Sequence, residues 1–140
     1  MSVTDKRDRR GLRGGWIYLA VSLFCLLFGA VYEHFSHGVY SSAMVYAFAY
    51  PLCLGAFPAL TLCMIGGRAQ RFIFTGASAR LWAYGIATLT VGSILSGVLE
   101  IYGTDSPLLI AYPIAGAALL VAGAVVKTLC VFTVKSDFVG

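Results

Sequence analysis

Residues 16–35 read WIYLAVSLFCLLFGAVYEHF, an apolar run in which Glu33 is the only carboxylate. At about 1.5 Å per residue, a helix of this length crosses the roughly 30 Å hydrocarbon core of a bilayer. The run is longer than the roughly 7–15 apolar residues of a signal peptide, and no A-x-A cleavage site follows it. The stretch therefore predicts a transmembrane helix that is retained in the protein.

Three further stretches have the same character, at 43–65, 81–102 and 108–131. Hydrophobic residues make up 59% of the chain and charged residues 11%, whereas about 25% of a typical soluble domain is charged. Because so few charges cannot cover a water-exposed surface, lipid is the expected solvent. The outer connections at 36–42 and 103–107 are short, which makes consecutive helices antiparallel neighbours. We predict an all-α polytopic membrane protein with four transmembrane helices in a bundle.

The basic residues lie on one side of this pattern. They precede the first span, lie between the second and third, or lie at the end of the fourth: Lys6, Arg7, Arg9, Arg10, Arg13, Arg68, Arg71, Arg80, Lys127 and Lys135. Because basic residues gather in cytoplasmic connections, we expect a bacterial inner (plasma) membrane protein with both termini in the cytoplasm. The basic residues that give the net charge of +4 then face anionic lipid headgroups, so this charge does not predict a nucleic-acid partner.

The charge pattern divides the chain into five parts. A basic cytoplasmic segment at 1–15 precedes the first hairpin at 16–65, and a basic cytoplasmic loop at 66–80 precedes the second hairpin at 81–134. A short cytoplasmic tail follows at 135–140.

The two hairpins also resemble each other. Each contains Trp-x-Tyr, a later glutamate and then Ala-Tyr-Pro, at 16–18, Glu33 and 49–51 in the first and at 82–84, Glu100 and 111–113 in the second. We interpret this as two parallel hairpin repeats related by an axis along the membrane normal. The alternative is coincidence, because Trp and Tyr are common at membrane interfaces.

Small and polar residues align on one face of the first and third spans, by steps of three, four or seven residues. The aligned residues are Tyr18, Ser22, Cys25, Gly29 and Glu33 in the first span and Gly85, Gly92, Ser96 and Glu100 in the third. Small residues let membrane helices approach closely, so these faces are expected to lie in helix contacts. Pro51, Pro58 and Pro113 fall inside spans, where each removes a backbone donor and favours a kink.

Glu33 and Glu100 are the first candidates for chemistry, because an ionisable side chain in a membrane span is a functional candidate. If the two halves pack about a pseudo-twofold axis, the carboxylates converge near the outer face and share a proton or bind a cation. The alternative is that they act separately as hydrogen-bond acceptors at the interface. Tyr50 and Tyr112 lie deeper, and each is a candidate hydrogen-bond partner for the opposite half's glutamate. These four residues form the predicted ion- or substrate-binding site.

His34 and His37 lie three residues apart at the end of the first span, and Asp105 lies in the second outer connection. Two imidazoles and a carboxylate can bind zinc or another divalent metal. The alternative is that the histidines are hydrated residues at a helix end. No motif predicts another cofactor or a catalytic residue.

Three classes of function remain open at this point. The first is transport or channel activity for a proton, cation or small solute through a site near the outer face. The second is a non-catalytic membrane subunit or scaffold of a larger complex, and the third is a metal-dependent or redox membrane enzyme. Because four helices enclose little space, we expect a homo-oligomer or other membrane subunits as partners, within the lipid bilayer.

Overall fold

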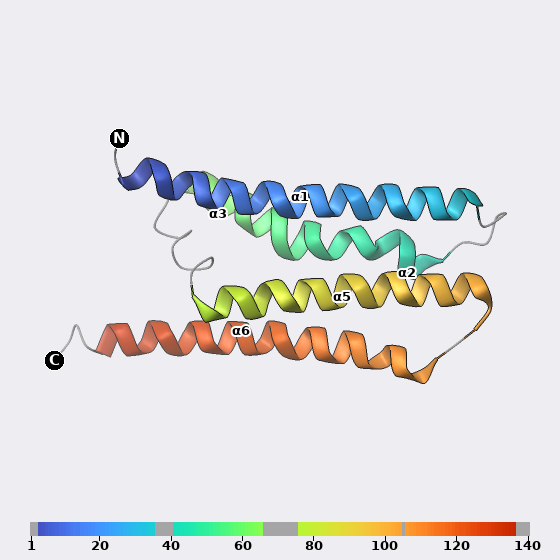
Figure 1. The fold of residues 1–140 in the computed structure, drawn as a ribbon. Coiled ribbons are helices and arrows are strands. Elements are labelled where there is room, and N and C mark those ends of the chain that lie inside the picture. The colour runs from blue at the N-terminus through green and yellow to red at the C-terminus, as the bar shows by residue number, and fades with distance from the viewer. Residues whose placement is uncertain (1–2, 36–40, 66–75, 105, 137–140) are drawn as a thin grey trace.

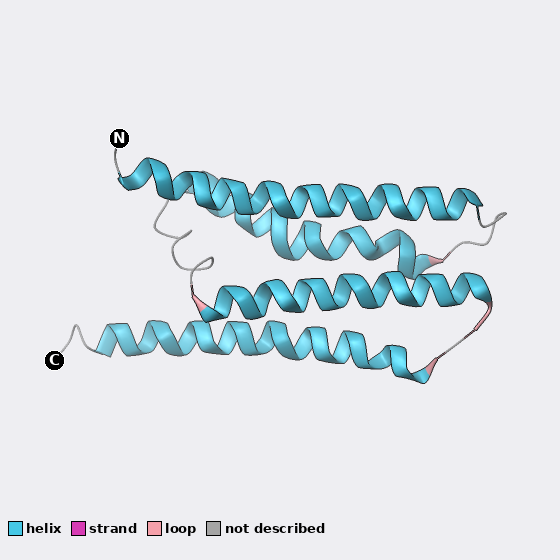
Figure 2. Cartoon of the chain, in the orientation of Figure 1, coloured by secondary structure: helices cyan, strands magenta, loops and turns pink. Residues whose placement is uncertain are grey.

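The computed structural model of this chain describes residues 3–35, 41–65, 76–104 and 106–136, with side chains described at 13–35, 41–61, 76–104 and 106–129. All regular structure in these ranges is helical (Figures 1 and 2). The three long helices are α1 (Val3–Phe35), α5 (Ala77–Tyr102) and α6 (Ala111–Ser136). A 3₁₀ turn, η3 (Pro107–Ile110), leads into α6.

Four helical stretches are long and apolar enough to cross a membrane: Arg13–Phe35, Ser42–Thr61, Ala77–Tyr102 and Pro107–Leu129. They agree with the predicted spans to within a few residues. The prediction of an all-α membrane protein with four spanning helices is therefore confirmed at this level, and the relation of the two hairpins as a repeat stays a prediction. The basic segment before Arg13 belongs to the same continuous helix as the first span.

The second span differs from the single helix that its apolar pattern predicts. It consists of α2 (Ser42–Val45), the 3₁₀ turn η1 (Tyr46–Phe48), the π-helix η2 (Pro51–Ala56) and α3 (Phe57–Ile65). Proline at the start of η2 has no N–H to offer to the preceding turn. At the other end of η2, the Phe57 N–H donates to the Leu52 carbonyl five residues back, which is the π pattern.

The other prolines disturb their helices less. Pro58 is the second residue of α3, and Pro113 lies in the first turn of α6, where a backbone N–H has no partner within the helix in any case. The helix is therefore irregular at Pro51, whereas α6 begins at Ala111 and continues through Pro113 without a break; the expected kinks stay a prediction.

The spans lie side by side in the order of the sequence and alternate in direction (Figure 1). α1 packs on η1, η2 and α3, α2 packs on α5, and α5 packs along α6. The second span therefore lies between α1 and α5.

Glycines bring these helices close together. A Cβ built on Gly55 of η2 would lie 2.5 Å from the Tyr18 ring of α1, and one built on Gly85 of α5 would lie 2.8 Å from Leu120 of α6. Ser22, Cys25 and Gly29, from the predicted small-residue face of the first span, are all buried.

Large apolar side chains lie mostly on the outside. Leu23 and Phe24 of α1, and Val121 and Leu129 of α6, are each more than half exposed. Such a surface is stable against hydrocarbon but not against water. The fold therefore has small residues between its helices and large apolar ones toward the lipid, as expected for helices packed in a membrane.

Candidate functional site

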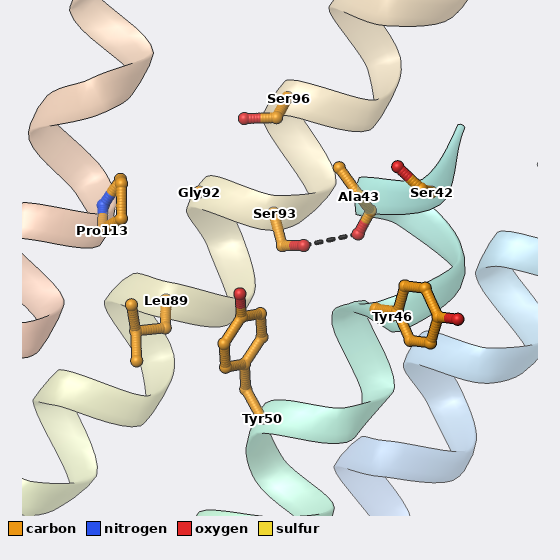
Figure 3. Close-up of a pocket in the computed structure, with 9 residues that line it drawn as sticks. All are labelled: Ser42, Ala43, Tyr46, Tyr50, Leu89, Gly92, Ser93, Ser96 and Pro113. Carbon is orange, nitrogen blue, oxygen red and sulfur yellow. Dashed lines mark hydrogen bonds between the residues drawn. The ribbon is translucent and has the colours of Figure 1, made fainter.

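A cavity of about 280 Å³ lies between the second span, α5 and the start of α6 (Figure 3). The residues that line it are Ser42, Ala43, Tyr46, Tyr50, Leu89, Gly92, Ser93, Ser96 and Pro113. Hydroxyl groups are frequent in this lining, and none of these residues carries a charge. The cavity lining is therefore uncharged and combines hydroxyl groups with apolar surface, within a protein whose exterior is apolar.

The cavity extends along the C-terminal half of α5. Leu89 lies at the middle of that helix, and Ser96 lies about 9 Å from its end at Tyr102, at 1.5 Å per residue. Against a hydrocarbon core of roughly 30 Å, this range runs from below one interface to the middle of the bilayer.

The wall from the second span is held in place by a hydrogen bond to α5. The Ser93 hydroxyl donates to the Ala43 carbonyl at 2.5 Å (Figure 3). Below this bond, the ring of Tyr50 extends beside Leu89, and Tyr50 directly precedes the π-helix. The local geometry of the second span thus brings Tyr50 into the lining.

Beyond the inner end of the cavity, Trp82 of α5 is bonded to the second span. Its indole Nε1–H donates to the Leu54 carbonyl at 2.9 Å. In a regular helix that carbonyl accepts from the residue four positions later, which here is Pro58 and has no N–H. Leu54 lies in the irregular segment η2, and Trp82 gives its carbonyl a hydrogen-bond partner from α5.

A third side chain supports the same span from α1, because the Ser22 hydroxyl donates to the Phe48 carbonyl at 3.0 Å. Irregular backbone at membrane depth requires such partners, since hydrocarbon offers none. The second span is thus an irregular segment held by α1 on one side and by α5 on the other.

Glu100 lies one helical turn beyond Ser96, toward the end of α5. Its carboxylate accepts a hydrogen bond of 2.5 Å from the hydroxyl of Ser41, which is 2% exposed. The same Ser41 oxygen accepts from the Met44 N–H at 3.3 Å and so caps α2. The carboxylate thereby fixes the start of the second span against α5, next to the cavity.

Met44 fills the space between α1 and α5 just below this bond. A Cβ built on Gly97 would lie 2.5 Å from the Met44 Cβ, and one built on Gly29 would lie 3.5 Å from the Met44 carbonyl oxygen. α2 therefore separates α1 from α5 at this level. Closer to the helix ends, the Tyr32 and Tyr102 hydroxyls approach each other across the same gap.

The four predicted binding residues fall into different places. Tyr50 lines the cavity, and Tyr112 packs against Gly92, a residue of the lining. Glu100 lies next to the cavity and has Ser41 as its partner, whereas Glu33 lies near the C-terminal end of α1, on the other side of the second span. Tyr50 and Glu100 are therefore associated with one site, and the convergence of the two glutamates stays a prediction.

The predicted metal ligands fall partly outside the described residues. His34 is exposed, and its ring makes an edge contact with Phe35 at a centroid distance of 5.8 Å. His37 and Asp105 lie outside the described residues. Within the described ranges, no three His, Cys, Asp or Glu side chains gather in a way that could hold a metal ion. The metal site therefore stays an untested prediction.

Sequence reasoning missed Ser42, Tyr46 and Ser93 as residues of the site. Ser93 and Ser96 are three residues apart and so share a face of α5 with Glu100, which was a usable signal. Ser42 and Tyr46 carried no signal, because their position depends on how the irregular second span packs against α5.

The fold and its apolar exterior define this chain as a helical, multi-pass membrane protein. Comparison with protein-family models, with curated proteins and with solved structures finds no match for it.

Proposed function

We propose that this protein is a small membrane transporter or channel for a proton, cation or small solute, and that its binding site is the cavity between the second span, α5 and α6. The observation that carries the proposal is the gathering of hydroxyl groups at membrane depth. A hydroxyl moved from water into hydrocarbon without a partner costs roughly 4–8 kcal/mol. Such groups are retained in a span when they have a hydrogen-bond partner, either within the protein or in a bound solute.

The orientation proposed from the basic residues places the termini in the cytoplasm and the cavity toward the outer side. Toward the inner side of α5, the Trp82–Leu54 bond and the contact of Gly85 with Leu120 close the space between the helices. These features support a state that is open outward and closed inward. Passage of a solute then requires movement at the π-helix η2, where the hydrogen-bond pattern is already irregular.

Flux into liposomes that contain the purified protein tests the proposal. Protons, potassium ions and a small neutral solute are each supplied on one side, and at least one is expected to cross faster than in empty liposomes. The double variant Glu33→Gln, Glu100→Gln separates the kinds of cargo. It abolishes passage of a proton or cation that uses the carboxylates but leaves passage of a neutral solute. Rates equal to those of empty liposomes for all three would refute the proposal.

The second candidate is a membrane subunit that assembles with other helices, including copies of itself. It is favoured by the exposure of the fourth span. Only 11% of the apolar stretch of that span is buried within the protein, whereas 33% of the second span's is. This candidate predicts that a defined partner co-purifies in mild detergent and that the isolated protein shows no flux. Flux by the isolated protein would exclude a purely structural role.

A further inference from the structure

We infer that the cavity binds a small, uncharged solute that both donates and accepts hydrogen bonds, such as an amide or a polyol. The inference rests on the proposed transport function and adds to it the chemical class of the cargo. It follows from three properties of the lining: the absence of charge, the hydroxyls that are left for a ligand, and the size of the space.

The lining offers no counter-charge to an ion. Among the residues that line the cavity, polar groups are hydroxyls and backbone, and none is a carboxylate or a basic side chain. Glu100 lies a helical turn beyond Ser96, is exposed, and accepts the Ser41 hydrogen bond. An ion that entered the cavity would lose its hydration without meeting a charge of opposite sign, which is costly in a medium of low dielectric constant. An uncharged solute avoids this cost.

Hydroxyls on facing helices remain for such a solute. The Ser93 hydroxyl is used by the Ala43 carbonyl. The hydroxyls of Tyr50 and Ser96, from facing helices, have no hydrogen-bond partner within the described part of the chain. Each can donate one hydrogen bond and accept others. A ligand that carries both donors and acceptors can satisfy the two at once.

The remaining walls restrict the ligand's size. Leu89, Gly92 and Pro113 are apolar, and Tyr112 packs against Gly92 so that this wall cannot recede. A volume of about 280 Å³ lies at the small end of the range of roughly 300–1,000 Å³ for ligand pockets. The cavity therefore suits a compact solute with few non-hydrogen atoms, polar at its edges.

Urea and guanidinium form a matched pair for testing this class, because they are similar in shape and differ in charge. Protein-containing liposomes are mixed rapidly with either solute, and entry is followed by light scattering. We expect urea to enter several-fold faster than into empty liposomes and guanidinium to enter at the same rate as into empty ones. Tyr50→Phe and Ser96→Ala are expected to slow urea entry several-fold. Tyr84→Phe, which removes a hydroxyl from an exposed position of α5, is expected to leave it unchanged.

Each result other than the expected one has a distinct meaning. If guanidinium or protons cross and urea does not, the neutral-solute inference is wrong while the transport function stands. If urea crosses equally fast in Tyr50→Phe, Ser96→Ala and the unchanged protein, the cavity is not the site. If no solute crosses, both proposals fail. Circular dichroism and elution from size-exclusion chromatography identify any variant that does not fold, and Ser42→Ala then serves as a third cavity variant.

Discussion

Gly97 is a residue at which α5 comes close to the second span. A Cβ there would lie 2.5 Å from the Met44 Cβ and 3.0 Å from its backbone nitrogen and Cα. Met44 is 3% exposed and lies between two helices, so its backbone has little room to move. The small-residue face of the third span was recognisable from its sequence, but Gly97 lies beside that face, and its contact with Met44 depends on the position of α2.

We predict that Gly97→Ala destabilises the protein by about 1–3 kcal/mol, the usual cost of overpacking. Gly14→Ala is the matched control, because a Cβ at Gly14 of α1 meets nothing within 4 Å. There, alanine is expected to be neutral or stabilising by up to about 1 kcal/mol, owing to its higher helix propensity. Thermal unfolding in detergent measures both. Equal melting temperatures for the two variants would show that Gly97 is not in a tight contact.

At the scale of the element, the second span shows best what its sequence could and could not predict. Apolar length and the flanking polar residues were sufficient to locate it. The change from 3₁₀ to π hydrogen bonding could not be predicted from apolar periodicity. The acceptor lies three residues back in a 3₁₀ turn, four in an α-helix and five in a π-helix, and such small steps leave the apolar pattern almost unchanged. The prolines indicated where disturbance would occur, but not that Trp82, Ser22 and Ser93 would supply the missing partners.

The hydrogen bond from Trp82 to the Leu54 carbonyl, four residues before Pro58, gives a prediction for this element. Trp82→Phe removes the indole donor and is expected to cost about 1–3 kcal/mol, because a part-buried carbonyl loses its partner. Pro58→Ala restores a backbone N–H four residues after Leu54. In the Trp82→Phe background it should therefore recover part of the lost stability, as measured by a double-mutant cycle in detergent.

Trp16→Phe is the control for loss of an indole, because Trp16 is 63% exposed on α1. It is expected to change stability by less than about 0.5 kcal/mol. Strictly additive effects of Trp82→Phe and Pro58→Ala would show that the Leu54 carbonyl does not couple the two residues.

At the scale of the whole molecule, the four spans form a row in which the second span lies between α1 and α5, and α6 packs along α5 (Figure 1). Composition and span lengths were sufficient to predict the class of protein. Of the residues that the sequence suggested for a site, Tyr50 lines the cavity and Glu100 lies next to it, and their role in binding stays a prediction. The cavity itself could not be predicted, because it forms between three helices whose mutual packing is decided by Gly92, Gly97 and Met44 rather than by a motif.

The proposed transport function requires that water reach the cavity from the side proposed as outer. The most direct test places a single cysteine at Ser96 or at Val91, a lipid-facing position of α5 that is 49% exposed, after replacing the four native cysteines by alanine. A membrane-impermeant, charged thiol reagent is then applied to the outer side of intact cells. We predict rapid labelling at Ser96→Cys and none at Val91→Cys, because thiols react as thiolates, which need water. Absence of labelling at Ser96→Cys, or equal labelling at both positions, would contradict the account.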